Sequence, residues 1–179
     1  DSSNIKINNC NIEHNGAGIK IQNTDAKITN SNFDFNMFIT IHLIDSENVE
    51  ITNCNINNGY RTGFKVLNSN CQINKNNIKN FMLNAFESDK NSNCDIRNNY
   101  WGNRFGPSLT EFGKGEKIKY RIVKVRVFPW AKEIYEDIGS DWETNDVFRK
   151  TKYNPERFKA LSFKEKDSDN DGAPDWWED

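Results

Sequence analysis

Residues 49–56 read Val49-Glu50-Ile51-Thr52-Asn53-Cys54-Asn55-Ile56, with small or apolar side chains at the first, third, sixth and eighth positions. The same spacing surrounds four other isoleucines, so the reference positions are Ile7, Ile28, Ile51, Ile73 and Ile96, separated by 21, 23, 22 and 23 residues. A fixed period of this kind is typical of a repeat architecture. Because strand side chains alternate between two faces, each unit predicts two short strands with a kink between them.

A second pair of apolar residues follows in each unit and predicts a third strand. The pairs are Ile19 with Ile21, Ile39 with Ile41, Phe64 with Val66, and Ala85 with Phe86. Turn dipeptides such as Asn15-Gly16 and Asn58-Gly59 separate the apolar segments. Three short strands in each unit of about 22 residues, repeated about five times, predict an all-β fold in which coils stack as a parallel β-helix.

Composition divides the chain into two regions. Of 29 asparagines, 26 lie in residues 1–103, whereas 31 of the 50 charged residues lie in residues 104–179. We therefore predict β-helix coils and their closing segment over 1–130, a capping and linking segment over 131–166, and an acidic loop over 167–179. The net charge of −2 argues against a nucleic-acid partner, and no apolar run approaches the roughly 20 residues of a membrane span.

Asparagine recurs two positions after four of the five reference isoleucines, at Asn9, Asn30, Asn53 and Asn98. In stacked coils, each side-chain amide can donate a hydrogen bond to the amide of the next coil, which satisfies polar groups that would otherwise be buried unpaired. We predict such an asparagine ladder in this column. None of the 29 asparagines begins an Asn-x-Ser/Thr sequon, which argues against a role as glycan acceptors.

The four cysteines also fall into columns. Cys10 and Cys54 share one column two coils apart, and Cys71 and Cys94 share another in adjacent coils. Strands of adjacent coils lie about 4.8 Å apart, a separation that permits a disulfide. Parallel side chains on neighbouring strands usually lack the required dihedral angle, and the sequence leaves the state of this pair open. We favour buried thiols that act as small apolar side chains.

The repeat resembles that of a known group of proteins. Ile7-Asn8-Asn9-Cys10-Asn11-Ile12 followed by Gly18-Ile19-Lys20-Ile21 is similar to the right-handed parallel β-helix repeat of pectate-lyase-like, periplasmic copper-maturation and archaeal or bacterial surface proteins, including the disaggregatase type. The segments Asn99-Tyr100-Trp101-Gly102, Gly106-Pro107-Ser108 and Val127-Phe128-Pro129-Trp130 resemble the ending of such helices. The resemblance covers about residues 1–130. It implies the fold but not the function, because the scaffold hosts lyases, hydrolases, epimerases and non-catalytic modules.

Outward-facing positions hold the candidate carbohydrate-binding residues. Lys20, His42 and Lys65 form one stripe, which is suited to an acidic sugar chain. Glu13 and Asp34, each six positions after a reference isoleucine, form another. Adjacent coils would bring these two carboxylates near the ~5–5.5 Å spacing of a retaining glycosidase. No arginine shares their column, so we predict contact with carbohydrate rather than catalysis, and no catalytic residue is assigned.

Two elements are expected beyond the repeats. Residues 119–128 hold strand-forming residues with a basic alternate face at Arg121, Lys124 and Arg126, and we expect them to close the last coil. Asn154-Pro155-Glu156 predicts the start of a short helix over about 155–165, because it supplies a capping amide, a proline at the first position and an acid in the first turn.

Residues 167–178 place acids at loop positions 1, 3, 5, 9 and 12 and a glycine at position 6, the arrangement that wraps oxygen ligands around Ca²⁺. With proline at position 8, this loop resembles the thrombospondin type-3 and dockerin-like loops of extracellular proteins, and the resemblance implies a structural calcium. Such a loop, with an affinity of ~10⁻⁴–10⁻³ M, is filled outside cells. The predicted ligands are Asp167, Asp169, Asp171, the carbonyl of Ala173, Asp175 and Glu178.

These features together predict a non-catalytic, secreted or cell-surface β-helix module that contacts carbohydrate and carries a structural calcium. The alternative is a polysaccharide lyase or glycoside hydrolase that acts on cell-envelope or acidic polysaccharide. An Asp/Arg/Lys cluster across three adjacent coils would favour the enzyme, and the repeats show none that is convincing. The chain begins within a repeat and ends just past the acidic loop, which predicts adjoining domains in a longer chain.

Overall fold

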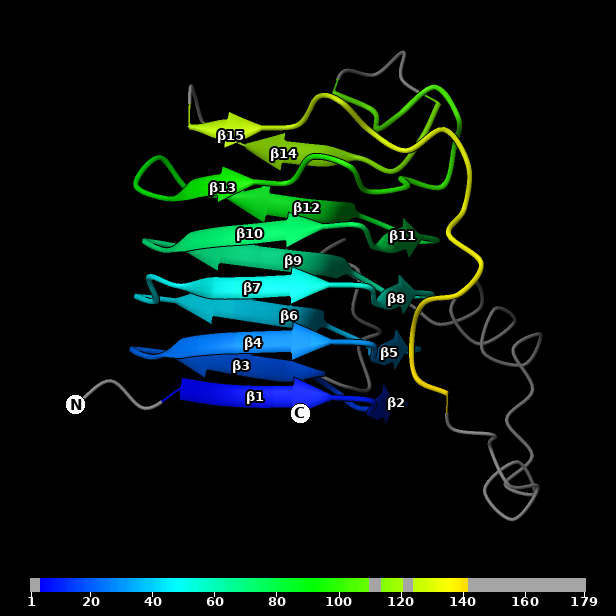
Figure 1. Ribbon diagram of the computed structural model, residues 1–179. Helices are drawn as coiled ribbons and strands as arrows, with labels where there is room; N and C mark the ends of the chain where they lie inside the picture. The colour runs from blue at the N-terminus through cyan, green and yellow to red at the C-terminus, as the bar shows by residue number, and fades with distance from the viewer. Residues whose placement is uncertain (1–3, 110–113, 121–123, 142–179) are drawn as a thin grey trace, which may run out of the picture. The chain divides into compact units, whose positions relative to one another are not determined.

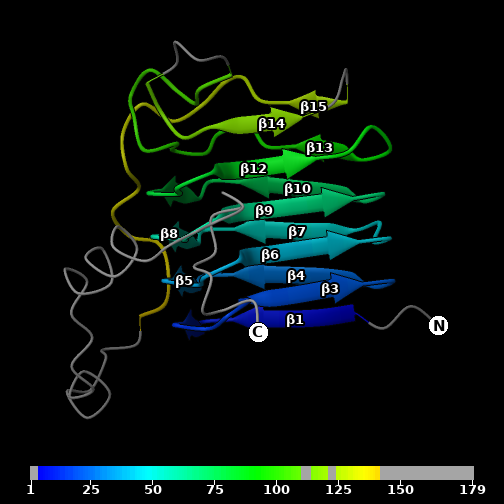
Figure 2. The ribbon, with the colours of Figure 1, turned by 180° about the vertical axis from the view of Figure 1, so that it is seen from behind.

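The computed structural model describes residues 4–109, 114–120 and 124–141. These residues form three sheets of parallel strands and contain no helix (Figures 1 and 2). Sheet A contains β1 (Asn4–Asn8), β4 (Asp25–Thr29), β7 (Val49–Thr52), β10 (Asn70–Asn74), β13 (Asn93–Asp95) and β15 (Val125–Arg126). Sheet B contains β2 (Asn11–Glu13), β5 (Asn32–Asp34), β8 (Asn55–Asn57) and β11 (Asn77–Lys79). Sheet C contains β3 (Ile19–Gln22), β6 (Ile39–Ile44), β9 (Thr62–Leu67), β12 (Asn84–Ser88) and β14 (Ile118–Tyr120).

The chain visits one strand of each sheet in turn, so each coil contributes one strand to every sheet. All inter-strand pairings are parallel and join equivalent positions of successive coils. Ile7 lies opposite Ile28, which in turn lies opposite Ile51. This is the parallel β-helix that the period predicts, with the reference isoleucines stacked in one column.

Four coils have all three strands, and a fifth is incomplete, in keeping with the roughly five that we predicted. In the next coil a single bridge between Asn77 and Tyr100 replaces the strand of sheet B, although Trp101 still fills the core position of that column and is fully buried. The chain then leaves the stack through Gly102, whose φ of 68° is a left-handed conformation that glycine adopts without strain. It rejoins sheet C at β14 and sheet A at β15. The predicted closing strand over 119–128 is therefore wrong as one element: two short strands in different sheets close the stack.

Each coil turns at three corners, and a residue with positive φ stands at nearly every one. Asparagine accounts for eight of these twelve non-glycine positions, in keeping with its tolerance of the left-handed region. The column of Asn9, Asn30, Asn53, Lys75 and Asn98 is one such corner, with φ between 48° and 58°. The asparagines that we assigned to a ladder are therefore selected for backbone conformation.

A ladder of side-chain amides does exist, two positions later in each coil. Asn32 donates from Nδ2 to Oδ1 of Asn11 (2.9 Å), Asn55 donates to Asn32 (3.1 Å) and Asn77 donates to Asn55 (2.8 Å). We name these four residues the ladder. The prediction of an asparagine ladder is confirmed, and its column is corrected.

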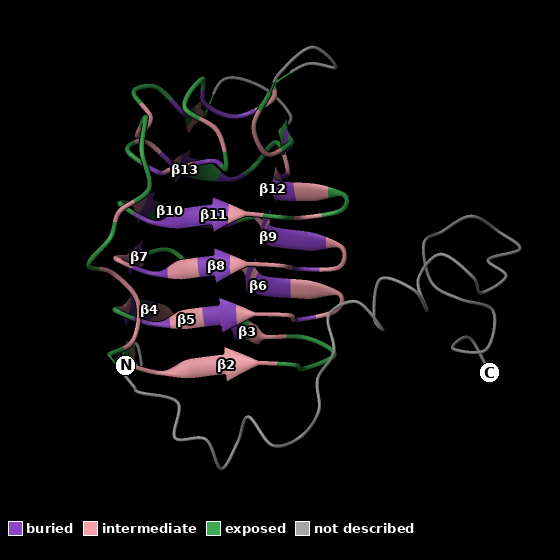
Figure 3. Cartoon of the chain, turned by 90° about the vertical axis from the view of Figure 1, so that its right-hand side faces the viewer, coloured by how far each residue is buried: buried purple, intermediate pink, exposed green. Residues whose placement is uncertain are grey.

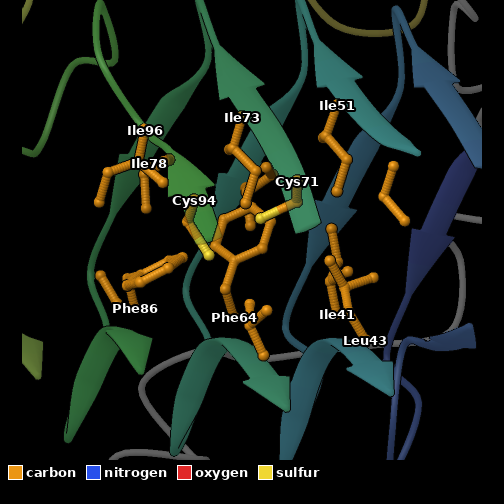
Figure 4. Packing of buried hydrophobic residues seen from close by; sticks show 14 of the residues in the cluster. Ile41, Leu43, Ile51, Phe64, Cys71, Ile73, Ile78, Phe86, Cys94 and Ile96 are labelled. Atoms are coloured by element: carbon orange, nitrogen blue, oxygen red, sulfur yellow. The ribbon is translucent and has the colours of Figure 1, made fainter. Parts of the chain in front are cut away.

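The core is a stack of aliphatic and aromatic side chains enclosed by the three sheets (Figure 4). In sheet C, Ile19 lies opposite Ile41 and Ile21 opposite Leu43. The second coil therefore contributes Ile41 and Leu43 to the core, not Ile39 and Ile41 as we predicted. The turn before Ile19 is one residue shorter than the turn before Ile41: Ile19 follows Ile12 by seven residues, whereas Ile41 follows Phe33 by eight. Sequence spacing alone therefore misplaced the register. Burying one such side chain contributes about 1.5–3 kcal/mol.

All four cysteines are free thiols, and Cys54, Cys71 and Cys94 are buried. Cys71 lies opposite Cys94 in adjacent strands, as predicted. A hydrogen bond to Cys94, together with burial, raises the pKa of Cys71, and burial raises the pKa of Cys54 to about 12. Cys54 and Cys71 therefore stay protonated, and the three buried cysteines serve as core side chains.

Of the C-terminal segments, the structure describes residues 131–141, which run back along the corner beside sheet B (Figure 1). The predicted helix over 155–165 and the predicted calcium loop over 167–179 lie outside the described residues.

Candidate functional site

A groove of about 240 Å³ lies on the outer face of sheet A. Its floor is a row of outward side chains in strict register: Glu50 opposite Gln72, Gln72 opposite Asp95, and Asp95 opposite Arg126. A second row of amides borders the first, with Asn70 opposite Asn93. The polar residues that line the groove are Asn48, Glu50, Asn70, Gln72, Asn93, Asp95 and Arg126.

Both acids of the groove are held by basic side chains. Arg97 donates to both oxygens of Asp95, from Nε at 2.9 Å and from the terminal guanidinium nitrogen at 2.6 Å, and Arg126 lies 3.6 Å away. The hydrogen bonds from Arg97 hold the pKa of Asp95 below its usual range. Glu50 pairs with Lys27 at 2.8 Å. The groove therefore presents carboxylates paired with basic side chains beside uncharged amides.

Sequence reasoning missed this groove. Its floor occupies the position just before each reference isoleucine, where the column reads Lys6, Lys27, Glu50, Gln72 and Asp95. The mixed charge of that column hides it, because the three residues that form the floor, Glu50, Gln72 and Asp95, are all of different types. One signal for the groove was present in the sequence. Each of these outward positions is polar, and they lie on sheet A, which has the most strands.

The predicted basic stripe exists on sheet C. Lys20 lies opposite His42, which lies opposite Lys65. Burial, and then the charges of Lys65 and Lys20, lower the pKa of His42. The column continues through Glu87 and Lys119, whose side chains approach to 3.7 Å. The stripe thus combines lysines with a neutral imidazole at pH 7.

The predicted pair of carboxylates lies on sheet B. Glu13 and Asp34 face each other across adjacent strands. Burial raises the pKa of Asp34, and the charge of Glu13 raises it further, while Asn58 donates a hydrogen bond of 2.8 Å to the Asp34 carboxylate and opposes that shift. The five predicted carbohydrate-binding residues therefore form two columns on different sheets and do not converge on one site.

Within the described ranges, no group of three or more His, Cys, Asp or Glu side chains is placed to hold a metal ion. The predicted calcium ligands, from Asp167 to Glu178, lie outside those ranges. In the same part of the chain, no helix has the length and hydropathy to cross a membrane.

Stacked coils of three parallel strands, with polar side chains on the outer faces, define this protein as a parallel β-helix protein. The family model described as "Right handed beta helix region" matches residues 1–118, and the chain belongs to that family. No curated protein and no solved structure matches the chain.

Proposed function

We propose that this chain is a non-catalytic β-helix module that contacts carbohydrate through the groove on sheet A. The observation that carries the proposal is the register of Glu50, Gln72, Asp95 and Arg126, which line one groove at the spacing of adjacent strands. Polar side chains that repeat every ~4.8 Å along the stack suit an elongated ligand whose polar groups also repeat along its length.

The chemistry of the groove fits hydroxyl groups. Amide side chains both donate and accept hydrogen bonds, carboxylates accept them and guanidinium donates them, so the groove can pair with a hydroxyl in either direction. The two negative charges of Glu50 and Asp95 are paired with three positive ones, those of Lys27, Arg97 and Arg126. Because the acids and most of the basic groups are already paired with one another, the groove suits a neutral saccharide.

The state of the acids supports binding rather than catalysis at the groove. General acid catalysis requires a carboxyl whose pKa is raised toward the working pH. Asp95 has its pKa lowered, and Glu50 is ion-paired.

A polysaccharide lyase or glycoside hydrolase remains the second candidate, and one observation favours it. Asp34 combines a raised pKa with a second carboxylate, Glu13, on the adjacent strand. Two neighbouring carboxyls, one of which has a raised pKa, are the arrangement from which glycosidases build an acid and a nucleophile or base.

The proposal includes a structural calcium bound by residues 167–178 and a secreted or cell-surface location. The spacing of Asp167, Asp169, Asp171, Asp175 and Glu178 supports the calcium. The location follows from the weak affinity of such loops, which calcium outside cells would saturate.

The test is binding to a panel of neutral and acidic polysaccharides in calcium, followed by mass spectrometry of the same samples for shortened chains. Gln72→Ala should weaken binding by roughly tenfold, which corresponds to about 1.4 kcal/mol. Gln22→Ala, an exposed glutamine on sheet C, is the matched control and should bind as the wild type does. Equal binding by both variants contradicts the groove as the site. Shortened chains that disappear in Asp34→Asn favour the enzyme.

A further inference from the structure

Residues 131–141, which we name the strap, run along the corner beside sheet B from the last coil to the first (Figures 1 and 3). The amide of Ala131 donates to the carbonyl of Asn99 (3.0 Å) near the top of the stack. At the other end, the amide of Asp141 donates to Oδ1 of Asn9 (3.0 Å) in the first coil. The strap therefore crosses every complete coil.

The side chains of the ladder form hydrogen bonds with the main chain of the strap. Asn77 accepts from the amide of Tyr135 (2.9 Å) and donates to the carbonyl of the same residue (2.8 Å). Asn55 donates to the carbonyl of Ile138 (2.8 Å). Asn32 accepts from the amide of Ser140 at 3.3 Å. A column of side-chain amides thus takes the place that a strand edge has in β-sheet pairing.

A few contacts are specific for the sequence of the strap. The hydroxyl of Ser140 donates to Oδ1 of Asn11 (2.6 Å), and the hydroxyl of Tyr135 donates to the carbonyl of Asn98 (2.8 Å). Gly139 has a φ of 100°, and a Cβ there would overlap Oδ1 of Asn32 and Nδ2 of Asn55. The ladder consequently fits this strap better than an arbitrary extended segment.

Apolar burial contributes little to holding the strap. None of its eleven residues is buried, and Ile134 is 45% exposed. Trp130, just before the strap, packs against the core and fixes the point from which the strap leaves the stack. Among the hydrogen-bond partners of the strap, Asn77 and Asn99 are buried, and Asn9, Asn11, Asn32, Asn55 and Asn98 are half-buried or exposed. An element held mainly by hydrogen bonds, with little apolar burial, opens at a lower free energy than the core strands.

We infer that the strap is exchangeable between copies of this chain, so that the ladder of one copy binds the strap of a second. The exchanged strap makes the same hydrogen bonds as the original, and the association is opposed mainly by the lost freedom of two molecules. Because the strap fits this ladder at Gly139, Ser140 and Tyr135, a second copy is the partner that matches it. When each of two copies binds the strap of the other on its own ladder, a closed dimer forms.

Two full-length variants test the exchange by complementation. Gly139→Ala cannot dock its own strap and leaves its ladder open, whereas Asn55→Leu has an impaired ladder and an intact strap. Each should be monomeric alone by light scattering. When they are mixed in equal amounts, native mass spectrometry should show a one-to-one heterodimer. The double variant Gly139→Ala/Asn55→Leu supplies neither an intact ladder nor an intact strap, and it should not pair with Gly139→Ala.

The inference is overturned if both single variants keep the β-sheet circular dichroism of the wild type and no heterodimer forms. It is also overturned if the double variant pairs with Gly139→Ala, since that dimer would use another surface. Should either variant fail to fold, ¹⁵N-labelled and unlabelled wild-type chains are concentrated together. Mixed dimers then support the exchange, and their absence at every concentration overturns it.

Discussion

Asn53 and Asn55 stand two positions apart on one turn, and the fold uses a different property of each side chain. Asn53 has a φ of 55°, a conformation that most side chains resist and asparagine tolerates. Asn55 lies in a strand, and its amide links the coils on either side of it. The periodicity of the sequence shows that both columns are rich in asparagine, but it carries no information about the backbone angle φ. For that reason the sequence predicted a ladder and assigned it to the wrong column.

Lys75 is the exception in the left-handed corner column, with a φ of 56°. Because a left-handed conformation costs a typical residue about 1–2 kcal/mol and asparagine less, Lys75→Asn should raise the free energy of unfolding by up to about 1 kcal/mol. Urea denaturation measures this change. Lys90→Asn, at an exposed turn position outside the positive-φ set, is the control and should leave stability unchanged. Equal effects of the two substitutions would refute the conformational explanation.

The interactions of Asp95 with two arginines should make the free energy of unfolding depend on pH. Hydrogen bonds from Arg97, and the charge of Arg126, place the folded pKa of Asp95 below its unfolded value of about 3.8. The ionised carboxylate therefore contributes its full stabilisation above that unfolded pKa, and loses it as the pH falls through the folded pKa. Asp95→Asn should be less stable than the wild type at pH 7, and the difference should shrink as the pH falls below 4. Denaturant titrations at pH 7, 5 and 3 measure it; a difference that does not vary with pH counts against the ion pair.

At the scale of elements, the ladder and the strap form one unit in which each coil is tied both to its neighbours and to a common segment. The columns of small and apolar residues predicted every complete strand of sheets A and B, because a period of about 22 residues leaves little freedom in register. Sheet C was less predictable. Turns of unequal length precede its strands, and Ile39, Ile41 and Leu43 all look suitable for the core.

Asn55→Leu should lower the free energy of unfolding by about 1–3 kcal/mol, because Asn32, Asn77 and the carbonyl of Ile138 each lose a hydrogen-bond partner. Thermal and urea denaturation both report the loss. Asn70→Leu makes the same chemical change at an exposed position in sheet A and should cost far less. A ladder without energetic value would make the two variants equally stable.

At the scale of the whole molecule, the solenoid places chemically different columns on three outer faces. Sheet A has the polar groove, sheet B has Glu13 and Asp34 beside the strap, and sheet C has the lysine stripe. Sequence reasoning identified two of these columns, since their residues repeat in kind. It missed the groove because Glu50, Gln72, Asp95 and Arg126 share only their polarity, and because Arg97 acts from outside the column.

The proposed calcium loop gives a prediction that separates the C-terminal segment from the solenoid. Asp167→Ala and Glu178→Ala each remove a carboxylate that the loop spacing assigns to the ion, so each should weaken calcium binding by at least tenfold in isothermal titration. The circular dichroism of the β-helix should stay as in the wild type, because the strand pairing and core packing described for the coils are complete within residues 4–141. Asp141→Ala, whose acid lies on the strap outside the loop, is the control and should bind calcium normally. Unchanged titrations in both loop variants would remove the calcium from the proposed function, and with it the main argument for an extracellular location, while the groove on sheet A would keep its own test.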